Sequence, residues 1–335
     1  MLHWKSLCLL TVEELAMLDV AEVNLACAEG LPGAESVPYA ECIDRLNHYA
    51  RCVRHHTERR MPDFHDQADK YDRSEAKFRI VCMISLLQNA FGIRYNPAKK
   101  PMDVPLDTAD KFIHGALVGD GGTCASLPVV YAAVGRRLGY PLKLVSCKGH
   151  LICRWEEASG ERFNIEVNDT GIDDPPDDNY RKGMYETSSW EEKAYCYLQS
   201  KTPKMELAGF LKERGLHLLK EERLREAAES FLWASSLVPH NEMYSLLANR
   251  TMTAWKGMVW EMRPPQAPEI TVFYPLRRRW PDTLPLAMEH WFILIETMES
   301  TLKRPLYQPW WEALRRSQGY RPYNIPTKMT VRLTS

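Results

Sequence analysis

Residues 121–168, GGTCASLPVVYAAVGRRLGYPLKLVSCKGHLICRWEEASGERFNIEVN, contain a change of hydrophobic period. Apolar residues recur at helical spacing over 127–138, and Gly139 and Pro141 then act as helix stop signals. Beyond them the period becomes two, which is typical of strands. The pattern therefore predicts a helix followed by three short strands over 142–147, 150–155 and 162–167.

Cys124 stands at the expected first turn of this helix, directly after Gly122 and Thr123. Threonine is a good N-cap residue. The free N–H groups and the partial positive charge of a helix N-terminus favour a thiolate, which is the nucleophilic form of cysteine. The same N–H groups can bind an oxyanion. The position therefore predicts a nucleophile at Cys124 supported by Thr123 and Gly122, although an isolated cysteine is more often an inert buried side chain. Pro128 removes one hydrogen bond near the end of that turn.

His150 opens the second strand, directly after the two-residue hairpin turn Lys148-Gly149. A histidine can take the proton of a thiol and return it to a leaving amine. If residue 150 pairs with residue 166, then His150, Asn164 and Glu166 share one face of the sheet. Glu166 is then expected to orient the imidazole, and Asn164 is the alternative. The opposite face is apolar, with Leu151, Cys153, Trp155, Phe163, Ile165 and Val167.

Two other groups of residues have types that carry chemistry. Cys147 would lie opposite His150 across the hairpin, but it has no helix N-terminus to lower its pKa, so we expect a structural role. A second group has metal-ligand residue types without a standard spacing, in a polar stretch that predicts a solvated loop. Metal-dependent chemistry there is the weakest hypothesis, and no metal or cofactor is expected. This group consists of His55, His56, Asp63, His65 and Asp66.

The first 118 residues are predicted to be helical. A capping box at Thr11-Val12-Glu13-Glu14 starts a helix that is expected to stop near Gly30. A second helix is expected from about Pro38 into the polar stretch 54–60, and a third from about Ser74 to Gly92.

Helices are expected to resume at Ser189, which starts another capping box. The predicted pair 205–219 and 223–237 has Gly215, Ala227, Phe231, Ala234 and Pro239 at the spacings of a tetratricopeptide repeat, and 241–262 extends it. One copy cannot bury its own apolar face, so it should pack on the neighbouring domain. Residues 263–285 hold six prolines and Arg277-Arg278-Arg279 and predict a linker, with a last helix near 286–303.

The composition excludes several classes of protein. The chain has 335 residues with 43 basic and 44 acidic side chains, which argues against a protein built to bind nucleic acid. Its nine cysteines form no CxxC pair, so we expect a reducing compartment rather than a disulfide framework. No window approaches 18 apolar residues, and the apolar run at the start is too short for a signal peptide. The sequence predicts a cytoplasmic protein that does not enter a membrane.

The Gly-Gly-Thr-Cys run, the histidine and acid on adjacent strands, the Gly-Tyr-Pro exit, the helical lead-in and the helical tail together resemble a bacterial transglutaminase-like family with tetratricopeptide repeats. The resemblance covers roughly residues 10–240 and is sharpest over 121–168. It implies an α+β fold with a papain-like core, in which a Cys-bearing helix packs on a small antiparallel sheet, followed by helical repeats. The implied domains are 1–188 (with a helical region over 1–118 and a Cys/His/Glu core over 119–188), a repeat-like region 189–262, and 263–335.

The resemblance also implies acyl transfer at an amide, with Cys124 as nucleophile, His150 as general base and Glu166 as the orienting acid, where the superfamily most often has Asp. Hydrolysis and transfer to an amine both stay open. A protein or peptide substrate is expected, and the repeat-like helices could bind a peptide. The oxyanion donor is not identified from the sequence, and Gln88, Asn89 and Tyr95 are the candidates. The alternative is a noncatalytic interaction module that keeps a degenerate form of this domain.

Overall fold

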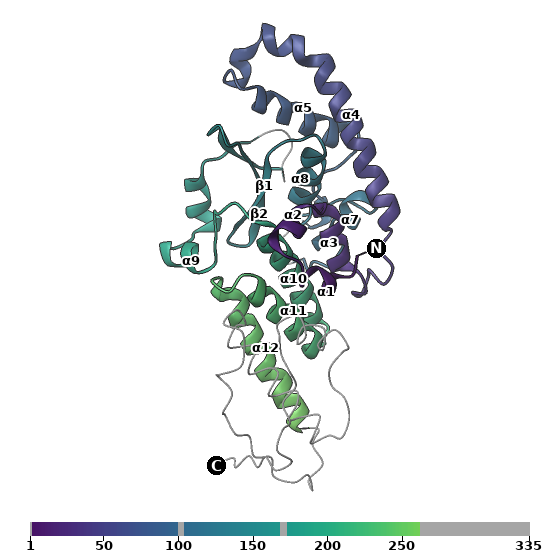
Figure 1. Cartoon of the computed structure of the whole chain (residues 1–335), viewed down its shortest axis with the longest axis vertical. Coiled ribbons are helices and arrows are strands. Elements are labelled where there is room, and N and C mark those ends of the chain that lie inside the picture. The colour runs from purple at the N-terminus through teal and green to yellow at the C-terminus, as the bar shows by residue number, and fades with distance from the viewer. Residues whose placement is uncertain (1, 100–103, 168–172, 262–335) are drawn as a thin grey trace.

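The computed structural model describes residues 2–99, 104–167 and 173–261. Figure 1 shows the long helices α4 and α5 at one end, the sheet and helix α8 in the middle, and helices α10, α11 and α12 at the other end. The predictions for Arg277-Arg278-Arg279, for the Pro-rich segment and for the helix near 286–303 lie outside the described residues.

Helices form the N-terminal region of the chain, as predicted, but two of their boundaries differ. The predicted helix over 12–30 is two helices, because Asp19 accepts a hydrogen bond from the N–H of Ala21 and caps a new start. The capping box of Thr11 and Glu14 is present. The helices of this region are α1 (Trp4–Leu7), α2 (Val12–Ala16), α3 (Val20–Ala28), α4 (Tyr39–Asp66), α5 (Glu75–Asn89), α6 (Thr108–Lys111) and α7 (Ile113–Val118).

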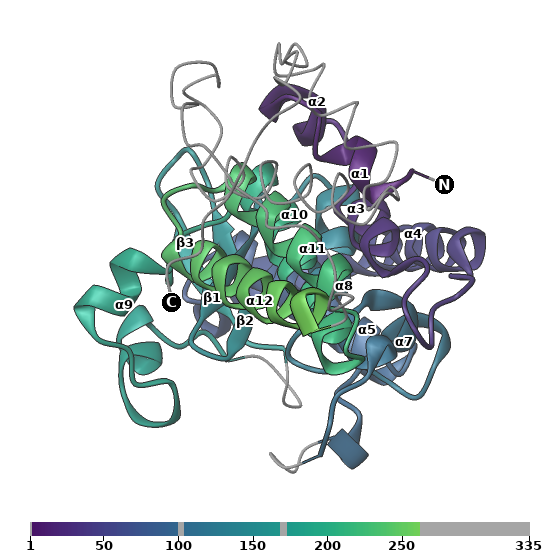
Figure 2. The same cartoon turned by 90° about the horizontal axis from the view of Figure 1, so that it is seen from below.

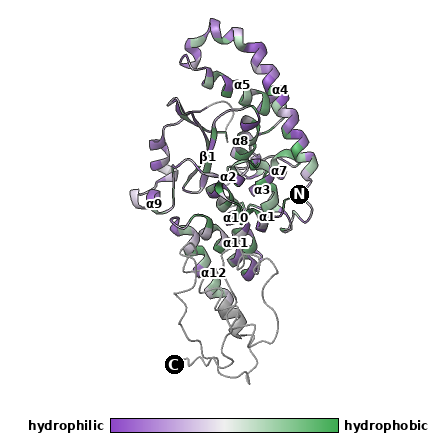
Figure 3. Cartoon of the chain, viewed as in Figure 1, coloured by the Kyte–Doolittle hydropathy of each residue, from purple (hydrophilic) through white to green (hydrophobic). Residues whose placement is uncertain are grey.

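Helix α4 continues through the polar stretch 54–60, which was expected to end it and to form a loop. Val53, Thr57 and Phe64 lie on its buried side, so the charged residues between them form the solvent face of one long amphipathic helix. Figure 3 shows the hydrophilic residues along α4 and the hydrophobic ones in the helices at the centre. The predicted loop was wrong because a solvent-facing helix side and a loop have similar compositions.

Helix α8 (Leu127–Arg137) begins three residues after Cys124, so this cysteine lies in the turn before the helix rather than in its first turn. The later start also explains Pro128, which occupies the second helical position, where no intrahelical hydrogen bond is lost. Nine consecutive residues of α8, from Leu127 to Gly135, are buried. The helix therefore forms the centre of the core.

The three predicted strands are confirmed as β1 (Leu142–Cys147), β2 (His150–Glu156) and β3 (Arg162–Ile165), which form an antiparallel sheet in that order. The predicted register was wrong by two residues, because Arg154 pairs with Asn164. A shift of two leaves every side chain on its predicted face. The apolar face packs into the core with α8, as expected, through Cys153, Trp155, Ile165 and Val167.

The C-terminal helices are α9 (Ser189–Ala194), α10 (Pro203–Lys220), α11 (Leu224–Leu237) and α12 (Glu242–Glu261). The capping box of α9 uses Ser188 and Glu191, one residue earlier than predicted. Gly215 of α10 faces the ring of Phe231 in α11, and a Cβ atom at Gly215 would lie only 2.5 Å from it. Figure 2 shows α10, α11 and α12 side by side. This describes three packed helices, and their assignment as a tetratricopeptide repeat stays a prediction.

Helix α10 packs on the rest of the molecule rather than standing alone. Arg136 of α8 forms a two-pronged ion pair with the buried Glu206 of α10, and Arg214 donates to the carbonyl oxygens of Cys27 and Glu29. The segment before α10 also extends the sheet, since the N–H of Lys201 donates to the carbonyl of Leu144 in β1 at 2.9 Å. These contacts bring α10 next to the residues singled out for chemistry.

Candidate active site

The turn that carries Cys124 is held by the buried residue before it. The hydroxyl of Thr123 donates to the carbonyl of Asp110 at 2.7 Å and accepts from the N–H of Ala125 at 3.2 Å. Its carbonyl accepts the N–H of Leu127 at 2.9 Å, which starts α8. Cys124 is half-buried in this turn, and its backbone N–H has no acceptor among the described residues. The local hydrogen bonds therefore hold the cysteine in place and leave its own backbone N–H available as a donor.

Gly122 brings a second segment to this turn. It bridges to Tyr95, and its carbonyl accepts the N–H of Asn96 at 2.8 Å. A Cβ atom at Gly122 would lie 2.7 Å from the side chain of Leu127, so only glycine fits without a shift. Burial raises the pKa of the Tyr95 phenol, and the nearby negative charge of Cys124 raises it further. Tyr95 is thus the oxyanion candidate that lies beside Cys124.

The other two oxyanion candidates have different surroundings. Gln88 is buried and hydrogen-bonds to Tyr131 in α8. Asn89 is exposed and donates to Ser85 within its own helix at 3.4 Å. The hydroxyl of Tyr95 also has a partner, since it donates to the carbonyl of Lys99 at 3.4 Å. What distinguishes Tyr95 is that the charge of Cys124 acts on its pKa.

His150 and Glu166 form one hydrogen-bonded pair, in which Nε2 of the imidazole lies 2.7 Å from Oε2 of the carboxylate. The other carboxylate oxygen accepts the N–H of Val167 at 2.9 Å, and Tyr180 donates to Oε2 at 3.4 Å. These bonds fix Glu166 directly after the end of β3. The carboxylate therefore reaches the imidazole although the register differs from the predicted one.

The imidazole of His150 also interacts with the side chain of Cys124, and the two residues line the same cavity. Burial lowers the pKa of His150, but the hydrogen bonds to Cys124 and Glu166 and their negative charges outweigh it and raise the pKa to about 9. The imidazole is thus protonated at neutral pH and faces both a sulfur and a carboxylate. Cys124, His150 and Glu166 therefore lie together, with a hydrogen bond between His150 and Glu166 and the side chain of Cys124 acting on the same imidazole.

Two tyrosines that sequence reasoning missed enclose His150. Tyr185 stacks on the imidazole with ring centroids 4.7 Å apart, and Tyr180 lies 6.2 Å away at an interplanar angle of 23°. Both come from 170–188, which was expected to be irregular and contains two short 3-10 helices, Asp177–Arg181 and Gly183–Tyr185. The tyrosine content of that segment was the only available signal. Stacking on both rings limits the rotation of His150.

Asn164, the alternative third residue, has other partners. It is buried, accepts from the Nε of Arg154 at 2.8 Å, and donates to Asp177 and to the carbonyl of Pro175. Arg154 is itself fully buried and binds Asp177 at 2.6 Å. Asn164 therefore belongs to a hydrogen-bond network that ties β2 and β3 to the segment after them.

Cys147 pairs with His150 across the hairpin, as predicted. It is buried, and burial, together with the charge of Glu166, raises the pKa of its thiol to about 12. A thiol with such a pKa carries almost no thiolate at neutral pH. These surroundings fit the structural role expected for Cys147.

A cavity of about 280 Å³ opens onto Cys124 and His150. One side consists of these residues and of β1, and the other consists of α10 and the start of α12. Glu206, Gly209 and Glu213 of α10 line it. The sequence did not predict that α10 lines the cavity, because this depends on how α10 packs against the distant segments that carry Cys124 and His150.

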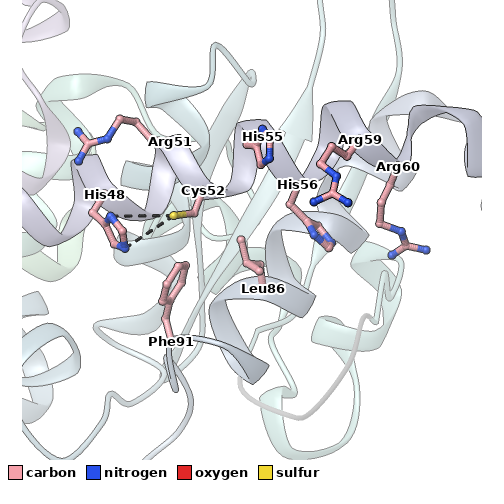
Figure 4. Close-up of a pocket in the computed structure, with 9 residues that line it drawn as sticks. All are labelled: His48, Arg51, Cys52, His55, His56, Arg59, Arg60, Leu86 and Phe91. Atoms are coloured by element: carbon pink, nitrogen blue, oxygen red, sulfur yellow. Dashed lines mark hydrogen bonds between the residues drawn. The ribbon is translucent and has the colours of Figure 1, made fainter.

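The five residues with metal-ligand types lie on helix α4, not in a loop. Among the described residues, no group of three or more His, Cys, Asp or Glu side chains is placed to bind a metal ion. His55 and His56 instead line a hollow between α4 and α5, together with Arg51, Arg59 and Arg60 (Figure 4). In the same hollow, Cys52 lies 3.7 Å from the Nε2 of His48. The arginines give this surface a positive charge, which disfavours a cation.

The described residues place a cysteine in a turn before a buried helix, and a histidine and an acid on and just beyond neighbouring antiparallel strands. In the comparison with protein families, residues 40–177, less than half of the chain, match the family described as the transglutaminase-like superfamily. Comparisons with curated proteins and with solved structures found no match.

The matched range begins inside α4 and includes Cys124, His150 and Glu166. It ends before α9, so helices α9 to α12 lie outside it. None of the helices among the described residues combines the length and the hydropathy that a bilayer crossing needs.

Proposed function

We propose that the protein is a cysteine-dependent acyltransferase or hydrolase that acts on amides. The observation that carries this proposal is the position of one imidazole, His150, which hydrogen-bonds to Glu166 and lines the same cavity as Cys124. The domain supports it, since members of the superfamily are often cysteine-dependent enzymes. In this proposal Cys124 is the nucleophile and His150 transfers the proton. Glu166 orients His150 and stabilises its protonated form.

In the first step, the sulfur of Cys124 attacks the carbonyl carbon of a carboxamide, and the C–O double bond opens to an oxyanion. The free N–H of Cys124 is the proposed donor to that oxyanion, and the hydroxyl of Tyr95 is a second one if it leaves its long 3.4 Å hydrogen bond to the carbonyl of Lys99. The C–N bond then breaks, and the leaving amine takes the proton of His150. A thioester and a neutral imidazole remain.

In the second step, water or an amine attacks the thioester, and His150 takes its proton. The Cys124–carbonyl bond breaks and the thiolate returns. Water gives hydrolysis and an amine gives transfer. Helix α10 forms one wall of the cavity at Cys124, and both outcomes stay open in this proposal. A protein or peptide is the proposed substrate.

The first test is alkylation with iodoacetamide near neutral pH, followed by peptide mapping. We expect Cys124 to react selectively and the selectivity to disappear in His150→Ala. The chain contains a matched internal control, because Cys52 is also half-buried and lies 3.7 Å from a histidine, His48, but no carboxylate is hydrogen-bonded to that histidine among the described residues. Cys52 should react more slowly than Cys124.

The second test is acyl transfer itself. With p-nitrophenyl acetate, we expect a burst of one nitrophenolate per chain and an acetyl group on Cys124, which added ethylamine removes as N-ethylacetamide. Tyr95→Phe should lower the burst rate by about tenfold or more if the phenol stabilises the oxyanion. Equal, slow labelling of several cysteines together with no burst would contradict the proposal and favour the noncatalytic interaction module.

A further inference from the structure

Lys201 is a buried cation that lines the cavity at Cys124. Only 8% of its surface is exposed, and its backbone is held by the hydrogen bond to Leu144 in β1. Its ammonium group has no hydrogen-bond or ion-pair partner among the residues that the structure describes. A buried charge without a partner is costly and is normally paired. The Nζ atom is not among the fully enclosed atoms that lack a partner, so the ammonium group is open to the cavity and can bind an anion there.

The nearby carboxylates are already occupied. Glu206 is held by both guanidinium nitrogens of Arg136, at 2.5 and 3.0 Å. Glu213 is shared by Lys111 at 3.1 Å and by Lys212 at 2.7 Å. In this group the four cations Arg136, Lys111, Lys212 and Lys201 stand against the two carboxylates Glu206 and Glu213, so about two positive charges are in excess and Lys201 is the cation without an ion pair.

Helix α10 also leaves space at this point. Gly209 lines the cavity, and a Cβ atom there would lie 3.5 Å from the Nζ of Lys201. Glycine inside a helix lowers stability relative to alanine. At Gly209 it places the backbone of α10 next to the ammonium group, although an alanine would meet the Nζ only at ordinary van der Waals distance.

We propose that Lys201 is a specificity residue that binds a carboxylate of the substrate while another portion of the same substrate reacts at Cys124. This inference rests on the proposed function and names its substrate class, an amide that also carries a carboxylate some bonds away. Lys201 and Cys124 line the same cavity, so one substrate can reach both side chains.

The test uses alkylating probes of graded length. Bromoacetamido-alkanoic acids with two to five methylene groups are compared with their primary amides, and modification of Cys124 is followed by peptide mapping. We expect one length of the acid to react faster than its amide by about tenfold or more, since a buried charge-assisted hydrogen bond favours the acid. Lys201→Met should abolish that preference, and Lys201→Arg should retain some of it.

Lys143 provides the matched control, because it is an exposed lysine on β1 and does not line the cavity. Lys143→Met should keep the full preference for the acid. Thermal unfolding of each variant shows whether it is folded, and methionine at position 201 replaces an unpaired charge with an apolar chain of similar length.

The outcomes separate the two proposals. If Cys124 reacts rapidly with the amides but shows no preference for any acid, or if Lys201→Met keeps the preference, the carboxylate site is wrong and the proposed function stands. If Cys124 reacts no faster than Cys52 with every probe, the proposed function is wrong and the carboxylate site falls with it.

Discussion

The Nε2 atom of His150 lies 2.7 Å from the Oε2 atom of Glu166, and this contact spans from the first residue of β2 to the residue after β3. It places a negative charge behind an imidazole whose other contact is the sulfur of Cys124. The protonation state of His150 is therefore the property of this site that an experiment can measure most directly.

We expect the imidazole of His150 to titrate well above the ordinary pKa of 6.5, near 9. Because its pKa is raised in the folded chain, its contribution to stability is complete below about pH 6.5 and is lost as the pH rises through about 9. Glu166→Gln removes one of the two hydrogen-bonded partners that raise the pKa, so the midpoint should fall by about one unit or more. NMR titration of the histidine ring measures it, and an unchanged midpoint in Glu166→Gln would show that the carboxylate does not charge the imidazole.

Asn164→Ala should lower the stability of the protein without changing the pKa of His150. It leaves the Nε of Arg154 and the carbonyl of Pro175 without their partner, so we expect the free energy of unfolding to fall by about 1–3 kcal/mol. The pKa of His150 should not change, because Asn164 does not contact it. Urea unfolding and the same NMR titration check both expectations. A large change in the pKa of His150 would favour Asn164 over Glu166 as the residue that orients the imidazole.

Two glycines of α10 make a matched pair. Gly215→Ala places a Cβ atom 2.5 Å from the ring of Phe231, and such overpacking should lower the free energy of unfolding by about 1–3 kcal/mol. Gly209→Ala meets only the Nζ of Lys201 at an ordinary 3.5 Å, so helix propensity should leave its stability equal or higher, by up to about 1 kcal/mol. Denaturant unfolding of both variants tests this, and equal losses would contradict the packing described for α10 and α11.

Lys201 predicts a dependence of stability on pH. Burial, together with the charge of Lys212, lowers the pKa of Lys201 to about 8, against the opposing charges of Glu206, Cys196 and Glu213. Between about pH 8 and the ordinary value of 10.5, the unfolded chain binds the proton more tightly, so the stability of the native chain should rise with pH. The difference in unfolding free energy between native chain and Lys201→Met isolates this effect. A difference that stays flat over this range would place Lys201 in a different environment.

The sequence predicted the strands, α8 and the three candidate residues because these depend on local patterns. Alternation over 142–167 fixes which side chains share a face, and this survived the wrong register because the shift was even. The start of α8 was misplaced because Thr123 caps a turn and Ser126, not Thr123, precedes the helix. The choice of Glu166 over Asn164 needed the partners of Asn164, which lie in another segment.

The cavity wall and Lys201 could not be predicted, because nothing within α10 marks which of its faces meets Cys124. That face is set by long-range ion pairs such as Arg136 with Glu206. Likewise, the stacking of Tyr180 and Tyr185 on His150 depends on the path of a segment without hydrophobic periodicity.

The hydrogen bonds that join the segment before α10 to β1 have a consequence for how the chain can be divided. The N–H groups of Leu198 and Lys201 satisfy the carbonyls of Ser146 and Leu144, which otherwise form the outer border of the sheet. A fragment that stops at residue 177, where the superfamily match ends, would expose this border as an open template for pairing with other chains. We expect such a fragment to aggregate, so the boundary of the matched family is not a boundary of independent folding.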